Sequence, residues 1–223
     1  MKRMEAERIA SLRTLLAAST GKLAAAFFET AFDSDPQALP AAIAEAKAVE
    51  IPAECTSQVE KNMVAGFRKL TDGIAAPAQT LRTFVRTVSK ISENDAMAIR
   101  YGRGMAVLSE VRPGVLRCRT DSGVIDMKLD DPRARHTFFA ALANYVASDP
   151  ECSRLLPAKT KGVKNKQQLQ KLRAQNIRWC EFHYRLMNRD FSPETAKLAP
   201  NDFWRRSFGE LKKGVSALPP RQK

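Results

Sequence analysis

The sequence predicts a mainly α-helical α+β protein with a small antiparallel β-sheet in the middle of the chain. Apolar residues recur at helical spacing through the first 93 residues and again after residue 132. Between those stretches, residues 96–129 contain four glycines and alternate apolar with polar side chains, which is typical of strands joined by tight turns. A hydrophobic fraction of 44% in 223 residues is sufficient for a packed core.

Four helices are expected before the sheet, separated mainly by prolines. They span residues 4–33, 40–50, 53–75 and 78–91. Proline ends a helix because it lacks the N–H and clashes with the preceding turn, yet it is tolerated in a first turn. In the third helix, apolar residues from Val59 to Ile74 are spaced by four, four, three and four positions. Such a stripe indicates a core-facing side, not a cofactor site.

Three strands are expected in the central region, over residues 105–111, 115–119 and 124–129. The turn at Arg112-Pro113-Gly114 joins the first two, because proline fixes φ and glycine tolerates positive φ. Alternation gives the sheet one apolar face and one wet, partly basic face. Because so few strands are marginally stable alone, we expect the sheet to pack against a helix.

That helix is expected over residues 132–147, where Asp131 provides an N-cap and Pro132 the first helical position. A loop at 151–165 then leads to a long helix near 166–189. Further helical turns are expected from Ser192 and from Asn201 or Asp202, followed by a flexible tail at 216–223. The predicted segments are a helical scaffold (1–93), a β meander with its helix (94–150) and a basic helical region (151–223).

Positive charge is concentrated in the second part of the chain. The whole chain has 37 Lys and Arg against 24 Asp and Glu, a net charge of +13. Residues 1–93 hold 12 basic and 11 acidic residues, whereas residues 94–223 hold 25 and 13. A basic region of this kind favours a polyanionic partner, most simply nucleic acid. The neutral N-terminal helices are expected to contact protein partners.

The densest basic block covers residues 154–180, which contain eight basic residues and no acidic one. A solvated helix usually mixes charges, whereas a surface that follows phosphates needs basic residues alone. Neutral amides in the block, among them Gln168 and Asn176, are expected to add hydrogen bonds to phosphate, sugar or base. The predicted nucleic-acid contacts of this block are Lys159, Lys161, Lys164, Lys166, Lys171, Arg173 and Arg178.

Two smaller basic clusters complete the predicted interface. The first lies on the meander and consists of Arg100, Arg103, Arg112, Arg117, Arg119 and Lys128, of which Arg103, Arg112, Arg117 and Arg119 are the predicted nucleic-acid contacts. A β-ribbon that carries arginines can enter a groove of a nucleic-acid duplex or follow a single strand. Edge strands of a sheet, however, also carry charged residues that prevent aggregation. The second cluster is Arg205 and Arg206. The aromatic residues that follow the basic block are expected in the core.

No motif in the sequence indicates catalysis, a metal or a cofactor. The four cysteines are far apart, and only His136 and His183 are available to join them. We expect the cysteines to be reduced and buried. The best metal-binding carboxylates near basic residues are Asp121, Asp126, Asp130 and Asp131, whose spacing fits turns and caps better than a metal site. No secretory signal and no run of roughly 18 apolar residues is found, so a cytoplasmic protein without membrane contact is expected.

Together these patterns predict non-catalytic binding to the phosphate backbone of DNA or RNA, within a larger nucleoprotein complex such as an RNA-guided or DNA-processing assembly. Two alternatives remain open at this stage. The first alternative is an adaptor whose basic half binds an acidic protein. The second is a divalent-metal nuclease that uses the central carboxylates. Composition does not separate DNA from RNA, or single strands from double strands.

Overall fold

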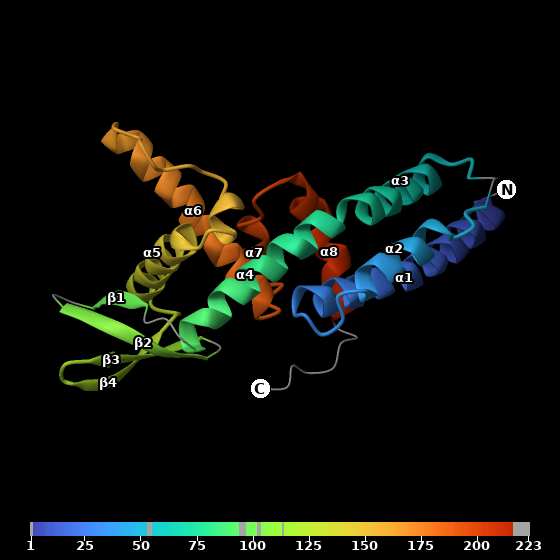
Figure 1. Cartoon of the computed structure of the whole chain (residues 1–223). Coiled ribbons are helices and arrows are strands. Elements are labelled where there is room, and N and C mark those ends of the chain that lie inside the picture. Colours follow the sequence, from blue (N-terminus) through green and yellow to red (C-terminus); the bar gives the residue numbers. More distant parts are fainter. Residues whose placement is uncertain (1, 53–54, 94–96, 102–103, 113, 216–223) are drawn as a thin grey trace. The chain divides into compact units, whose positions relative to one another are not determined.

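The computed structural model describes residues 2–52, 55–93, 97–101, 104–112 and 114–215. The predicted fold class is confirmed, because the described chain consists mainly of helices with one small antiparallel sheet (Figure 1). The expected turn residue Pro113, the tail at 216–223 and the candidate contact Arg103 lie outside the described residues.

The helices and strands occur in the predicted order, with one additional strand. The elements are α1 (Lys2–Ala31), α2 (Ala38–Lys47), α3 (Gln58–Gly73), α4 (Ala75–Glu93), β1 (Ala98–Tyr101), β2 (Gly104–Arg112), β3 (Val115–Thr120), β4 (Gly123–Lys128), α5 (Pro132–Ser148), a 3₁₀ helix (Cys152–Arg154), α6 (Lys166–Met187), α7 (Pro193–Lys197) and α8 (Asp202–Val215).

The chain forms two compact units. One unit contains residues 1–82 together with 201–223, and the other contains residues 83–200. This division differs from the three consecutive segments 1–93, 94–150 and 151–223 anticipated from the sequence. The difference arises because α8 returns to pack against α1. There the ring of Trp204 meets that of Phe27 edge-on, with centroids 5.8 Å apart.

In the first unit, α1 packs against α2, α3 and α8. The third helix starts at Gln58, five residues after the predicted start at 53. Ser57 and Glu60 account for this start because they form a capping box: the Ser57 hydroxyl accepts from the Glu60 N–H, and the Glu60 carboxylate accepts from the Ser57 N–H. The buried Glu60 carboxylate also lies 3.3 Å from the Arg8 guanidinium, so its charge is compensated.

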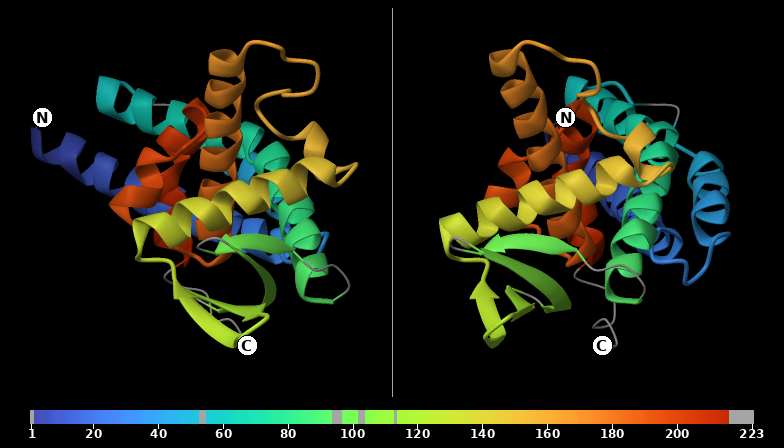
Figure 2. Two further views of the ribbon diagram at one scale, coloured as in Figure 1. Left: turned by 90° about the vertical axis from the view of Figure 1, so that its left-hand side faces the viewer. Right: turned by 60° about the vertical axis from the view of Figure 1, so that its left-hand side comes forward.

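In the second unit, the four strands form an antiparallel sheet in the order β1-β2-β3-β4. The predicted meander is therefore confirmed, with β1 as an additional edge strand. As predicted, α5 lies along one face of the sheet (Figure 2), where it contacts β1 and β4. Phe138 and Leu142 of α5 are buried, and so are Leu116 and Cys118 of β3. The register shifts between Leu108 and Glu110 of β2, and such irregularities locally increase strand twist.

The C-terminal half of α6 packs against α5 through aromatic rings. Tyr184 contacts Phe138 and Phe139 edge-on, with ring centroids 5.2 and 5.5 Å apart, and Trp179 lies near Phe84. The expectation that these aromatic residues belong to the core is confirmed. The four cysteines are free, as expected, but Cys55 is only partly buried whereas the other three are fully enclosed.

Candidate nucleic-acid interface

The predicted basic block folds as a loop followed by the first half of α6. The loop is attached at its base by Asn176, whose side-chain amide forms two hydrogen bonds with the backbone of Ala158. Asn165 begins α6, because its side-chain oxygen accepts from the Gln168 N–H at 2.9 Å. The end of α6 that carries the basic residues projects beyond α5, with the loop beside it (Figure 2).

The first turns of α6 are almost unpacked. From Lys164 to Gln175, every side chain is exposed apart from Leu169 and Leu172, which are half-buried. Tertiary packing usually supplies most of a helix's stability. The exposed first turns therefore gain little from the core, and this part of α6 is available to a partner.

Five basic side chains on this loop and helix are exposed and have no ion-pair partner in the described part of the chain. They are Lys161, Lys164, Lys166, Lys171 and Arg173. The first turn of α6 contains no acidic residue. Positive charge is unfavourable there because the helix dipole is itself positive at the N-terminus. The resulting surface has positive charge that no acidic residue in the described chain compensates, and it is therefore suited to bind an anion.

Two other residues of the block already have protein partners. The Lys159 ammonium donates to the Ser153 carbonyl at 3.0 Å, near the end of the 3₁₀ helix. The Arg178 guanidinium donates to the carbonyl of Lys197. Because a carbonyl carries no net charge, both residues keep their positive charge, but their side chains also hold the fold together.

Asn176 does not have the role expected from the sequence. The sequence predicts that it offers a neutral hydrogen bond to a nucleic acid, but it is only 4% exposed and both ends of its amide bind Ala158. Its pairing satisfies backbone groups that would otherwise be buried without partners. The signal in the sequence is weak, because an amide between basic residues is equally typical of a surface.

The arginines on the meander are partly neutralised. The Arg112 guanidinium binds both carboxylate oxygens of Glu110, and Arg117 binds both oxygens of Asp126 while lying 3.6 Å from Glu110. The hydrogen bond from Arg112 lowers the pKa of Glu110, and that from Arg117 lowers the pKa of Asp126. Arg119 is exposed and has no such partner among the described residues.

Arg117 and Asp126 are directly opposite in the β3–β4 register, so their pairing depends on strand alignment and was missed from the sequence. Glu110 was also missed as a counter-ion. The remaining predicted cluster, Arg205 and Arg206, lies on α8 in the other compact unit. There Arg205 pairs with Asp202 at 3.2 Å, one turn earlier, while Arg206 is exposed.

The central carboxylates occupy separate structural positions. Asp126 pairs with Arg117, Asp131 caps α5 by accepting from the Arg133 N–H, and Asp121 lies exposed in the β3–β4 turn. Among the described residues, no three His, Cys, Asp or Glu side chains are grouped so that they could hold a metal ion. His183 is fully enclosed by Phe84, Trp179 and Phe182.

Comparison with known proteins gives no match: neither a family model, nor a curated protein, nor a solved structure is significantly similar to this chain. The assignment of a function therefore depends on the residues themselves. Within the described chain, every helix is too short or too polar to cross a membrane.

Proposed function

We propose that the chain is a cytoplasmic, non-catalytic nucleic-acid-binding protein that contacts the phosphate backbone of DNA or RNA through the loop and first half of α6. One observation carries this proposal: Lys161, Lys164, Lys166, Lys171 and Arg173 are exposed and have no acidic partner in the described residues. We refer to these five residues as the α6 cations.

The arrangement of the α6 cations costs free energy in the unbound protein. Like charges one turn apart repel each other by a few tenths of a kcal/mol, and the positive end of the helix dipole adds to this cost. A phosphate backbone removes both penalties and also releases condensed counterions, which is the main source of sequence-independent affinity. The sheet contributes Arg119, while Glu110 and Asp126 compete with phosphate for Arg112 and Arg117.

The first compact unit supports membership of a larger nucleoprotein complex. Met4 is 68% exposed, Val59 is 50% exposed and Leu15 is 39% exposed, although all three are large apolar residues on helices. Met4 and Leu15 also line a hollow between α1 and the segment before α3. Exposed apolar residues beside a hollow are typical of protein contact surfaces.

The proposal is tested with a variant in which the five α6 cations are changed to glutamine. Fluorescence anisotropy would measure the affinity of labelled single- and double-stranded oligonucleotides across a salt series. A matched control changes Lys22, Lys47, Lys61, Arg68 and Lys69 to glutamine, which removes the same charge from α1–α3. The two ion pairs removed in that control are exposed and contribute little to stability.

We expect the α6 variant to melt normally and to bind at least tenfold more weakly at about 0.1 M salt. The slope of log K against log salt should become shallower by about 0.7–0.9 for each phosphate that the variant no longer neutralises. The control should retain most of the affinity and slope. Equal binding by parent and α6 variant, or no binding by the parent at low salt, would reject the proposal. An acidic protein partner would then be the better hypothesis. Labelled strands incubated with Mg²⁺ should remain intact.

A further inference from the structure

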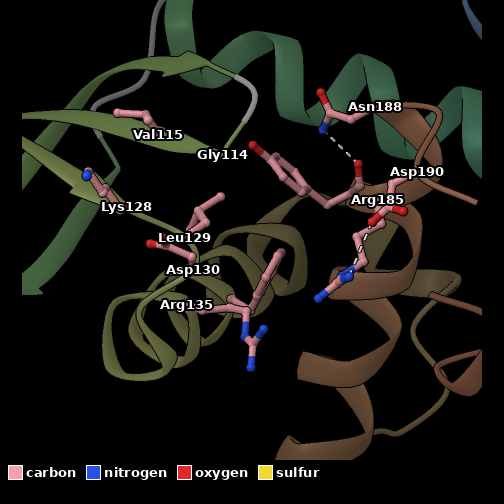
Figure 3. Close-up of a pocket in the computed structure, with 11 residues that line it drawn as sticks. Gly114, Val115, Lys128, Leu129, Asp130, Arg135, Arg185, Asn188 and Asp190 are labelled. Carbon is pink, nitrogen blue, oxygen red and sulfur yellow. Dashed lines mark hydrogen bonds and ion pairs between the residues drawn. The ribbon is translucent and has the colours of Figure 1, made fainter. Parts of the chain in front are cut away.

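A pocket of about 550 Å³ lies in the second compact unit, at one end of the sheet. Figure 3 shows that its walls come from three places. Val115 and Lys128 belong to the sheet, Arg135 projects from α5, and Asn188 and Asp190 follow α6. This volume exceeds what one side chain fills and lies within the usual range for small-ligand sites.

The inner wall of the pocket is mainly apolar. It contains Val115, Leu129, Phe139 and Tyr184. The Phe139 and Tyr184 rings meet edge-on, so the aromatic corner is held rigidly by packing within the core. Flat heteroaromatic groups bind well to surfaces of this kind, because they bury area against aliphatic and aromatic side chains.

One polar atom in this wall lacks a partner. Tyr184 is only 4% exposed, and its hydroxyl oxygen has no partner at normal hydrogen-bond geometry among the described residues, although the Asn188 side chain lies close enough to influence it. A buried hydroxyl without a partner is unfavourable, and such groups normally have one. Burial also raises the pKa of Tyr184 to about 12, an effect that nearby Asn188 partly offsets. The phenol therefore remains protonated and able to donate at neutral pH.

The side-chain amide of Asn188 is the second polar group at this wall of the pocket. Its amide nitrogen donates to the Tyr184 backbone carbonyl at 2.8 Å, which fixes the orientation of the side chain. The hydroxyl of Tyr184 and the side-chain amide of Asn188 thus place polar groups at the edge of the apolar wall, where a nucleobase needs hydrogen-bond partners.

Charge at the pocket is divided between paired and unpaired groups. Arg185 is bound to Glu181 and Asp190 at 2.8 and 3.2 Å, so it is compensated. Lys128 and Arg135 have no ion-pair partner in the described part of the chain, and the only other charged lining residue is Asp130. The two unpaired cations therefore lie where a phosphate attached to a bound base could reach them.

We propose that this pocket binds a nucleotide, with the base against Tyr184 and Asn188 and the phosphate near Lys128 and Arg135. In its preferred form, which rests on the proposed function, the nucleotide belongs to a single strand that the α6 cations hold. Lys166 and Tyr184 are 18 positions apart on the same helix, or about 27 Å at 1.5 Å per residue. That length corresponds to about eight nucleotides if the strand keeps the stacked rise of about 3.4 Å per nucleotide found in a duplex, and to fewer if it is extended.

The experiment compares three probes on the full chain. They are a labelled single strand of 12 nucleotides, the same sugar-phosphate strand without bases, and free nucleoside monophosphates measured by calorimetry. The test variant is Tyr184→Phe, which retains the ring and removes the hydroxyl. The matched control is Tyr145→Phe, because Tyr145 lies on α5 but does not line the pocket.

We expect the parent to bind the intact strand at least tenfold more tightly than the abasic strand. Tyr184→Phe should reduce that preference by about twofold to tenfold, as expected for one hydrogen bond, while it melts at the same or a higher temperature. Tyr145→Phe should preserve the preference. Binding of free nucleotides that depends on Tyr184, without any preference for the intact strand, would support the nucleotide site and identify the free nucleotide as its ligand.

The proposal is overturned if intact and abasic strands bind equally and free nucleotides do not bind. It is also overturned if Tyr184→Phe behaves like the parent with every probe. Both results leave the proposed function intact, because phosphate binding by the α6 cations requires no base. Conversely, unchanged oligonucleotide binding in the five-glutamine variant would reject the proposed function while the free-nucleotide arm still tests the pocket.

Discussion

The side chain of Asn176 pairs with both backbone groups of Ala158, 18 residues earlier in the chain. The Ala158 N–H donates to the amide oxygen at 3.1 Å, and the amide nitrogen donates to the Ala158 carbonyl at 3.0 Å. The Asn176 amide therefore makes the same pair of hydrogen bonds to Ala158 that the backbone of a neighbouring β-strand would make. This pairing attaches the start of the loop to α6, and the loop then carries Lys159, Lys161 and Lys164.

Removing this pairing is expected to weaken both the fold and the interface. Asn176→Ala leaves the N–H and carbonyl of Ala158 buried without partners, at a cost of about 1–3 kcal/mol for each group. We expect a lower melting temperature and weaker oligonucleotide binding, because the released loop must be ordered again on binding. The exposed Gln175→Ala serves as control. Unchanged melting and affinity in Asn176→Ala would show that other interactions hold the loop.

The stability of the protein is expected to decline in mild acid because of His183. Its Nδ1 lies 2.8 Å from the Trp179 carbonyl, which can only accept, so Nδ1 carries the proton of the neutral ring. Burial lowers the pKa of His183 to about 4 from an ordinary value near 6.5. Between these values the unfolded chain binds a proton that the folded chain does not, so stability rises with pH.

The contribution of His183 is therefore complete above pH 6.5 and is lost as the pH falls toward 4. The full difference corresponds to about 3 kcal/mol at 1.36 kcal/mol per pKa unit. Urea unfolding at pH 7, 6 and 5 measures it. His183→Gln should remove most of this decline, while the exposed His136→Gln should keep it. A parent free energy of unfolding that is flat between pH 7 and 5 would contradict the assignment.

The packing of α5 on the sheet should depend strongly on Leu142, which is completely buried. Leu142→Ala leaves a cavity and is expected to cost roughly 2–5 kcal/mol. Asn144→Ala changes an exposed residue on the same helix and should be nearly neutral. Thermal melting of both variants checks this expectation. Similar melting temperatures would mean that the sheet and α5 are not one cooperative core.

The two kinds of arginine on the sheet should differ in binding. Arg119→Gln removes an exposed cation that has no acidic partner within the described chain, whereas Arg112→Gln removes one that Glu110 already holds. We expect Arg119→Gln to weaken oligonucleotide binding more than Arg112→Gln, although the net charge changes equally. Anisotropy titrations at low salt measure both. An equal decrease in affinity would indicate that only net charge matters on this surface.

Much of the fold could be predicted from local sequence patterns. Apolar periodicity and proline positions identified the helices, and alternation between glycine turns identified β2 to β4. The four-residue β1 is too short to show a pattern of its own. The start of α3 was missed although the spacing of Ser57 and Glu60 carries the capping-box signature. The return of α8 to α1 was not predictable, because nothing in either helix alone specifies its partner.

The candidate site likewise has some features that could be predicted from the sequence and others that could not. The lack of ion-pair partners for the α6 cations within the described chain could be predicted, because a stretch of sequence without acidic residues leaves no counter-ion one helical turn away; their role in binding stays a prediction. The sheet arginines were only partly understood, because the Arg117–Asp126 pair depends on strand register. The nucleotide pocket was not foreseen at all, since Lys128, Arg135 and Asn188 come from three elements that meet only in the fold.

The packing of Phe27 against Trp204 has a consequence for the order of events during protein synthesis. The two residues are 177 positions apart in the chain. At about 5–20 residues per second, α1 waits roughly 10–35 seconds for α8 to be translated. Residues 83–200 contain the whole of the other unit and are completed first. We therefore expect the segment translated first to reach its native state last, with its apolar residues accessible to a ribosome-associated chaperone in the interval.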